Sequence, residues 1–118
     1  MDRHHRIDYV EFTVGDFAVA KAFYGAAFGW EFNDYGDAYV GIRGGADGRE
    51  AGGFALGEPR GGGPLVIVYS DDIDASLGAV VAAGGTITRE LFDFPGGRRF
   101  HAADPFGNEF AVWTEASH

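Results

Sequence analysis

The sequence contains no cysteine, which excludes a disulfide framework, a thiol nucleophile and a thiolate metal site. Basic residues are also few: nine lysines and arginines stand against eighteen acidic residues, for a formal charge of −9. This balance argues against nucleic acid or an anionic membrane surface as a partner, because no basic patch is available to meet phosphates. No apolar run reaches membrane-spanning length, and residues 1–6 lack the apolar stretch of a signal peptide. The expected location is therefore the cytoplasm.

The clearest positive feature of the chain is an internal repeat with a spacing of 56 residues. The repeated positions are Asp16 and Asp72, Gly29 and Gly85, Arg43 and Arg99, and the tripeptides 54–56 and 110–112. Each copy is too short to build a good core alone, so the two copies predict one domain over residues 1–118. Its expected parts are a first repeat at about 7–57, a Gly/Pro-rich linker at 57–64 and a second repeat at about 65–115.

Hydrophobic periodicity predicts a strand, a helix and three strands in each repeat. In the first repeat the strands are 7–14, 30–32, 39–43 and a segment centred on 54–56, and residues 44–53 form a loop. In the second repeat the strands are 65–69, 86–88, 98–103 and 108–114, with a turn at 104–108. Asp16 caps the first helix, which ends at Gly29, and Asp72 or Asp74 caps the second, which ends at Gly84–Gly85. The expected buried helix residues are Val19, Ala22, Phe23 and Ala26, then Leu77, Val80 and Val81.

Three short motifs add a family resemblance to this order of elements. Phe28-Gly29-Trp30 follows the first helix, Asp71-Asp72-Ile73 begins the second, and Asp104-Pro105-Phe106-Gly107-Asn108 forms the late turn. Together with the two βαβββ repeats, these motifs resemble the vicinal oxygen chelate superfamily, which includes glyoxalase I, bleomycin-resistance proteins and extradiol dioxygenases. The resemblance implies an α+β fold in which two βαβββ units form a curled mixed sheet around a cup, with the helices on its outer face. It also implies a homodimer, as in the resistance proteins.

Metal-binding members of that superfamily carry a His, Glu or similar ligand on the first and last strand of each unit. Counting from the helix-capping Asp and from the Asp-Pro turn, the corresponding positions here are Tyr9, Ala55, Leu65 and Ala111. Leu and Ala have no donor atom, and neutral Tyr is a poor ligand, whereas such centres need converging imidazole and carboxylate groups. We therefore predict a metal-free site without a cofactor.

Strand alternation assigns residues to the inner face of the predicted cup. These residues are Tyr9, Glu11 and Thr13 of the first strand, Leu65, Ile67 and Tyr69 of the fifth, and Glu109, Ala111 and Trp113 of the last. An apolar and aromatic lining with a few polar groups is typical of a site for a small, partly hydrophobic ligand.

Two titratable residues are candidates for catalysis. Glu11 lies mid-strand on the cup face, and it is either a general base or ligand-orienting group, or a carboxylate that is solvated or paired with an arginine. His101 is either an acid/base group near the cup or a hydrogen-bonded strand histidine. Arg98 and Arg99 point to opposite faces, and one of them meets either a ligand carboxylate or an acidic surface residue. The histidines near the chain ends, to which we assign no role, are His4, His5 and His118.

The leading functional hypothesis is a glyoxalase/bleomycin-resistance-like protein that holds a small molecule in a metal-free cup. Such a protein sequesters its ligand or catalyses a metal-independent reaction of the lyase or isomerase type. The alternative is a metal-dependent glyoxalase-type lyase or an extradiol dioxygenase-like enzyme. That alternative needs the metal ligands that this chain lacks.

Overall fold

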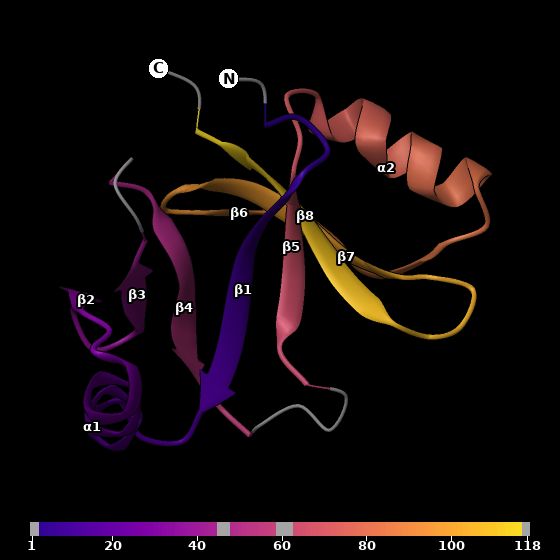
Figure 1. The fold of residues 1–118 in the computed structure, drawn as a ribbon. Helices are drawn as coiled ribbons and strands as arrows, with labels where there is room; N and C mark the ends of the chain where they lie inside the picture. The colour runs from indigo at the N-terminus through magenta and orange to yellow at the C-terminus, as the bar shows by residue number, and fades with distance from the viewer. Residues whose placement is uncertain (1–2, 45–47, 59–62, 117–118) are drawn as a thin grey trace. The chain divides into compact units, whose positions relative to one another are not determined.

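The computed structural model describes residues 3–44, 48–58 and 63–116 (Figure 1). The chain divides into two compact units, which we call the N-terminal unit (residues 9–64) and the C-terminal unit (residues 65–118 together with 1–8). No helix among the described residues is long and apolar enough to cross a membrane. The cellular location remains a prediction.

The N-terminal unit contains a four-stranded mixed sheet and one helix. Its elements are β1 (Ile7–Val14, in this unit from Tyr9), α1 (Phe17–Phe28), β2 (Phe32–Tyr35), β3 (Tyr39–Arg43) and β4 (Glu50–Leu56). The strand order is β2-β3-β4-β1, in which β1 and β4 run parallel and the other neighbours antiparallel. This is one βαβββ unit, as the repeat predicts.

The C-terminal unit repeats the arrangement. Its elements are β5 (Leu65–Tyr69), α2 (Ile73–Ala82), β6 (Thr86–Phe94), β7 (Gly97–Ala103) and β8 (Glu109–Glu115). The strand order is β5-β8-β7-β6, again with one parallel pair, β5 with β8. The predicted α+β fold of two βαβββ units is confirmed.

Both helices start at the predicted aspartates. The Asp16 carboxylate accepts a hydrogen bond from the Val19 backbone N–H at 3.1 Å, and the Asp72 carboxylate accepts one from the Ala75 N–H at 3.2 Å. At the C-terminal ends the repeats differ. Gly29 has a left-handed φ of 73° directly after α1, but after α2 the left-handed residue is Gly84 (φ 104°), one position before the repeat partner of Gly29.

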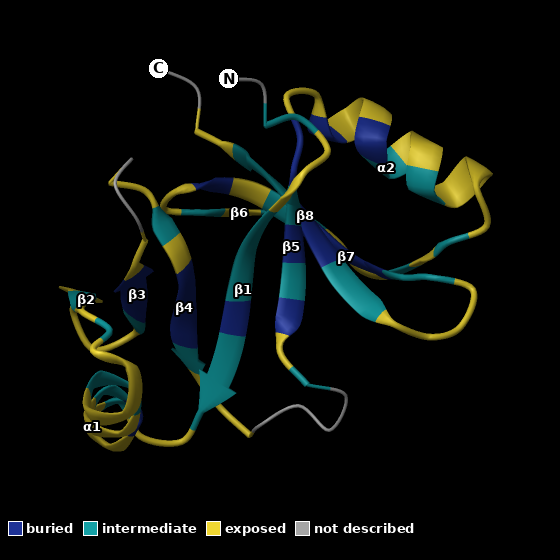
Figure 2. Cartoon of the chain, in the orientation of Figure 1, coloured by how far each residue is buried: buried dark blue, intermediate teal, exposed yellow. Residues whose placement is uncertain are grey.

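Each helix covers one face of its own sheet and leaves the other face without a helix from that unit. In the N-terminal unit the buried cluster under α1 consists of Ala20, Val40, Ile42 and Phe54, with Phe12 and Tyr24 packed against it. In the C-terminal unit the cluster under α2 consists of Ile73, Phe100, Ala102 and Val112. Figure 2 shows in dark blue where buried residues lie along the strands and helices, on either face of the sheets. We call the opposite side of each sheet its open face.

The helix faces that periodicity predicts to be buried are partly wrong. In α1, Val19 is 66% exposed and Phe23 is 60% exposed, whereas Ala20 is 8% exposed. The helix is rotated about its axis relative to the predicted orientation because the Tyr24 ring packs on two other rings. Its centroid lies 4.9 Å from that of Trp30, on which it stacks, and 5.7 Å from that of Phe54. The exposed residues of the expected stripes also include Ala22, Ala26 and Val81.

The strands that differ most from their expected bounds are β2, β6 and β4. Strand β2 begins at Phe32 rather than residue 30, β6 continues to Phe94, and β4 begins at Glu50 within the expected loop. Glycine explains the last difference, because a Cβ on Gly52 would lie 2.1 Å from the Val10 carbonyl oxygen. The glycines let the β4 backbone approach β1, so this Gly-rich segment is a strand. Residues 45–47 of the expected loop and 59–62 of the expected linker lie outside the described residues.

The parallel strand pairs of the two units, β1 with β4 and β5 with β8, differ in register by two residues relative to the sequence repeat. Ala55 lies opposite Thr13 in the N-terminal unit, whereas Ala111 lies opposite Ile67, the repeat partner of Glu11. Since side chains alternate with a period of two, this offset keeps every residue on its face. Both alanines therefore lie on the open face of their own unit.

Candidate functional site

On the open face of the N-terminal unit, β1 presents Tyr9, Glu11 and Thr13, because Phe12 and Val14 pack under α1. Glu11 is 7% exposed and is one of the few buried charged residues. Across the ladder it lies opposite Gly53, which in turn lies opposite Gly41. Two glycines therefore separate Glu11 from Asn33 at the far end of this cross-strand row.

The Tyr9 hydroxyl is hydrogen bonded to the Tyr39 hydroxyl at 2.8 Å. The Tyr39 ring lies over Gly53, where a Cβ would come within 2.2 Å of the Tyr39 hydroxyl oxygen. Burial raises the pKa of Tyr9 well above its usual range, and the nearby carboxylates of Glu50 and Glu11 raise it further, against the opposing effect of the Tyr39 bond. The Tyr9 phenol is therefore neutral and protonated at any physiological pH.

Glu50 forms a second polar group on the same face. Its carboxylate accepts hydrogen bonds from the Tyr35 hydroxyl at 2.5 Å and from the Asn33 side-chain amide at 3.0 Å. The carboxylate lies over Gly41, where a Cβ would meet it at 2.0 Å. The bond from Tyr35 to Glu50 raises the pKa of Tyr35. Arg43 completes the group by donating to the Asn33 side-chain oxygen at 2.9 Å.

The open face of the C-terminal unit is apolar and aromatic. Leu65, Ile67 and Tyr69 of β5 are 2%, 3% and 8% exposed, and Ala111 of β8 is fully buried. The rings of Tyr69 and Trp113 pack edge to face, with their centroids 5.4 Å apart. The Trp113 indole N–H donates to the Asp8 carboxylate at 2.9 Å, so a hydrogen bond as well as the contact with Tyr69 holds this large ring.

Arg3 adds a cation to this aromatic pair. Its guanidinium lies 3.7 Å from the centre of the Tyr69 ring and 5.6 Å from that of Trp113. It also forms ion pairs with Glu115 and with Asp8. Arg3, in the segment that precedes β1, thus belongs to the open face of this unit, which the sequence did not indicate.

His101 lies on the same open face, because it pairs with Ala111 across β7 and β8. It is 7% exposed, and its Nδ1 lies 3.5 Å from the Glu109 carboxylate. Glu109 also accepts a hydrogen bond from the Thr88 hydroxyl at 3.0 Å. Arg98 and Arg99 of the same strand point to opposite faces. Arg99 lies opposite Trp113 of β8 on the open face, whereas Arg98 forms an ion pair with Asp93 at 3.3 Å.

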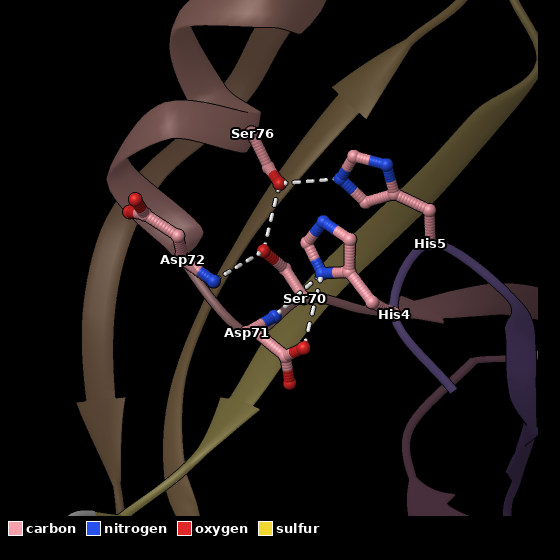
Figure 3. A network of polar contacts seen from close by, with 6 residues as sticks. All are labelled: His4, His5, Ser70, Asp71, Asp72 and Ser76. Atoms are coloured by element: carbon pink, nitrogen blue, oxygen red, sulfur yellow. Dashed lines mark hydrogen bonds and ion pairs between the residues drawn. The ribbon is translucent and has the colours of Figure 1, made fainter. Parts of the chain in front are cut away.

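His4 and His5, which received no role from the sequence, take part in a polar network at the start of α2 (Figure 3). His5 Nε2 lies 2.9 Å from the Ser76 hydroxyl, which is hydrogen bonded to the Ser70 hydroxyl at 2.7 Å. His4 Nδ1 accepts a hydrogen bond from the Asp71 N–H at 2.8 Å. Because Ser70 and Ser76 are buried, this network holds the N-terminal segment in place and offers no accessible nucleophile. His118 lies outside the described residues.

The fold agrees with what sequence comparison finds. The family whose sequence model matches residues 6–112 is described as the Glyoxalase/Bleomycin resistance protein/Dioxygenase superfamily. The chain belongs to this superfamily. The resemblance stated from the sequence motifs is therefore confirmed.

Individual superfamily members are similar to the chain at lower identity. Two curated relatives, each named "Putative glyoxylase CFP32", come from Mycobacterium bovis and Mycobacterium tuberculosis and are 30% identical over 120 residues. The match covers 94% of this chain and 46% of each relative, so the chain spans about half the length of these curated relatives.

Solved structures of superfamily members show the same fold. A Mn(II)-bound glyoxalase from Novosphingobium aromaticivorans is 27% identical with a TM-score of 0.69, over 100% of this chain and 42% of that chain. A methylmalonyl-CoA epimerase from Streptomyces coelicolor, in complex with 2-nitronate-propionyl-CoA, has a TM-score of 0.68 at 18% identity, over 98% of this chain and 100% of that chain. At that identity the epimerase supports the fold alone.

The residues at the four positions that the resemblance assigns to metal ligands do not fit a metal ion. Ala55, Leu65 and Ala111 have no donor atom, and the fourth position holds the Tyr9 phenol, which is bonded to Tyr39 and has a raised pKa. Among residues 3–44, 48–58 and 63–116, no group of three or more His, Asp or Glu side chains could hold a metal. A divalent centre needs several converging imidazole or carboxylate groups, and these four positions provide none.

Proposed function

We propose that this superfamily member binds a small, partly hydrophobic molecule on its open faces without the help of a metal ion. The observation that carries the proposal is the replacement of all four metal-ligand positions by Tyr9, Ala55, Leu65 and Ala111. Tyr9 and Ala55 give the open face of the N-terminal unit a phenol and a methyl group, and Leu65 and Ala111 give that of the C-terminal unit apolar surface. Metal-binding members of the superfamily have His, Glu or similar ligands at these positions. The bound molecule is then either sequestered or converted by the chain's own side chains.

The open-face residues supply what such a ligand needs. Ile67, Tyr69 and Trp113 offer buried or partly buried apolar and aromatic surface, and aromatic rings favour flat partners. The polar groups on these faces include Glu11, Thr13, the Tyr9–Tyr39 pair, Glu50 with Asn33, and His101 with Glu109. Glu11 and His101 remain the proposed acid/base residues if the ligand is converted.

A thermal-shift screen of small aromatic and carbonyl compounds tests this proposal, with each compound measured in EDTA and in added Mn²⁺. A ligand at a hundred times its dissociation constant stabilises the fold by about 2.7 kcal/mol, which raises the melting midpoint by on the order of 10 °C. We expect hits whose shifts are the same in EDTA. The Trp113→Ala variant should lose them, while Phe106→Ala, at a 90% exposed position in the late turn, should keep them.

The second candidate function is a metal-dependent glyoxalase-type lyase. The 27% identity to a Mn(II)-bound glyoxalase favours it. Turnover of a glutathione hemithioacetal that requires an added divalent ion, and stops with a chelator, would establish this function in place of the metal-free one. Shifts in the ligand screen that appear only with Mn²⁺ would have the same meaning.

A further inference from the structure

Arg3 lies in a corner formed by two aromatic rings on the open face of the C-terminal unit. The rings of Tyr69 and Trp113 are nearly perpendicular, with an angle of 80° between their planes. The Arg3 guanidinium carbon lies 3.7 Å from the centre of the Tyr69 ring and 5.6 Å from that of Trp113. The negative face of an aromatic ring attracts a cation, and a planar guanidinium group stacks on it well. The two rings therefore form two walls of a site for a planar cation.

Two carboxylates complete the surroundings of this guanidinium group. Glu115 accepts a hydrogen bond from Arg3 Nη2, and the Asp8 Oδ1 lies 3.7 Å from Arg3 Nη1. The Asp8 side chain is only 10% exposed and accepts a hydrogen bond from the Trp113 indole N–H, so its carboxylate is held beside the rings. We call Tyr69, Trp113, Asp8 and Glu115 together the Arg3 site.

The charges of the Arg3 site favour a cation over an anion. Burial lowers the pKa of Arg3, but the contact with Tyr69 and the carboxylates of Glu115 and Asp8 outweigh burial, and the pKa is raised above its usual range. Two carboxylates also outnumber the one guanidinium group. An anionic ligand would meet this excess of negative charge, so the ligand group that fits the site is positively charged.

Arg3 fills the site imperfectly, because the backbone restrains it. Its Nη1 is buried and has no hydrogen-bond partner in the described part of the chain. A buried donor that lacks an acceptor costs stability. The segment that carries Arg3 is fixed through His5, which contacts the Ser76 hydroxyl and donates its backbone N–H to the Tyr69 carbonyl. A ligand cation is free of that restraint and can direct its donors toward both carboxylates.

We propose that the Arg3 site binds the planar cationic group of a partly hydrophobic ligand, an amidinium or a guanidinium, and that Arg3 occupies the site until the ligand displaces it. The proposal rests on the metal-free function proposed above and names the chemical class of the ligand. Arg3 acts as a tethered competitor. If it fills the site in about nine molecules of ten, the apparent affinity for a ligand is about tenfold lower than that of the empty site.

Benzamidine is a suitable probe, because it joins a planar amidinium cation to an aromatic ring. Its binding to the full chain is measured by isothermal titration calorimetry in EDTA. We expect Arg3→Gln to bind benzamidine about tenfold more tightly than the wild type, because the competitor is gone. Benzamide has nearly the same shape without the charge, and benzoate has the opposite charge. Neither compound should gain affinity from Arg3→Gln.

Arg98→Gln is the matched control, because it removes the same charge from the same unit. Arg98 forms ion pairs with Asp93 and Asp74 and points to the other face of β7 from the neighbouring Arg99. This variant should bind benzamidine like the wild type. Equal gains for Arg98→Gln and Arg3→Gln would mean that benzamidine responds only to the net charge of the protein, and would overturn the Arg3 site.

Two changes added to Arg3→Gln test the walls of the site. Glu115→Gln should weaken benzamidine binding by about threefold to tenfold, because it removes a charged acceptor. Trp113→Ala should abolish the gain, with the fold checked by circular dichroism. The Glu115 side chain is 49% exposed, so its replacement leaves the core unchanged and keeps the test decisive if Trp113→Ala does not fold.

Three outcomes would overturn the cation site: no tighter binding of benzamidine by Arg3→Gln, an equal gain for benzamide, or no loss on adding Glu115→Gln. The metal-free function survives these outcomes if uncharged aromatic compounds still stabilise the protein in EDTA. Its own failure has a different signature, namely ligand shifts that appear only with Mn²⁺.

Discussion

The imidazole Nε2 of His5 lies 2.9 Å from the buried hydroxyl of Ser76 at the start of α2. The His5 backbone N–H also donates to the Tyr69 carbonyl at 2.7 Å. His5 has a positive φ of 63°, which a non-glycine residue adopts at some cost. The contacts with Ser76 and Tyr69 offset that cost and fix the segment that brings Arg3 onto Tyr69.

A double-mutant cycle measures the first of these contacts. Ser76→Ala should lower the free energy of unfolding by about 1–2 kcal/mol, because it removes hydrogen bonds to both His5 and Ser70. With His5→Ala, the coupling energy from urea unfolding should be about 0.5–1.5 kcal/mol. Strictly additive losses would show that the contact does not stabilise the fold.

The orientation of α1 predicts opposite effects at neighbouring positions. Val19→Glu should change stability by less than about 0.5 kcal/mol, because Val19 is exposed and a carboxylate in the first helical turn is favourable. Ala20→Glu should cost more than about 2 kcal/mol, since it places a charge in the buried cluster under α1. Urea unfolding of both variants checks this prediction. A larger loss of unfolding free energy for Val19→Glu than for Ala20→Glu would mean that the helix face with Val19 and Phe23 is the buried one.

Stability at high pH should depend on Tyr9. A tyrosine whose folded pKa is raised contributes stability that is complete below its unfolded pKa of about 10 and is lost as pH rises above that value. The wild type should therefore lose stability between about pH 10 and 11.5 more steeply than Tyr9→Phe, measured by urea midpoints at each pH. Parallel profiles for the two proteins would contradict the burial of this phenol.

Gly78 offers a simple stabilising change. It lies inside α2, and nothing in the described structure comes within 4 Å of an added Cβ. Gly78→Ala should raise the free energy of unfolding by about 0.5–1 kcal/mol, because alanine loses less backbone entropy in a helix. Gly84→Ala is the contrast: its φ of 104° should make the same substitution destabilising. Thermal melts of the two variants should move in opposite directions.

Much of the fold follows from local chemistry that can be read along the chain. Asp16 and Asp72 cap helices because a short acidic side chain reaches the free N–H groups of the first turn. This contact does not depend on residues far away in the sequence. Strand alternation assigned Glu11 and Trp113 to open faces, because pleating depends only on the backbone. The residues at the four positions that the resemblance assigns to metal ligands could also be named, since three of them have no donor atom and the fourth is a phenol.

The tertiary structure decided what depends on contacts between distant residues. Periodicity placed Val19 and Phe23 inside because α1 is apolar on more than one side, and only the stacking of Tyr24 on Trp30 fixed its rotation. The Tyr9–Tyr39 pair joins residues 30 positions apart, and it depends on a glycine in a third strand. Two βαβββ units could be predicted along the chain, because capping, alternation and residue chemistry are local. Strand pairing and packing decide which hydroxyls, carboxylates and histidines come into contact, because these residues are far apart in the sequence.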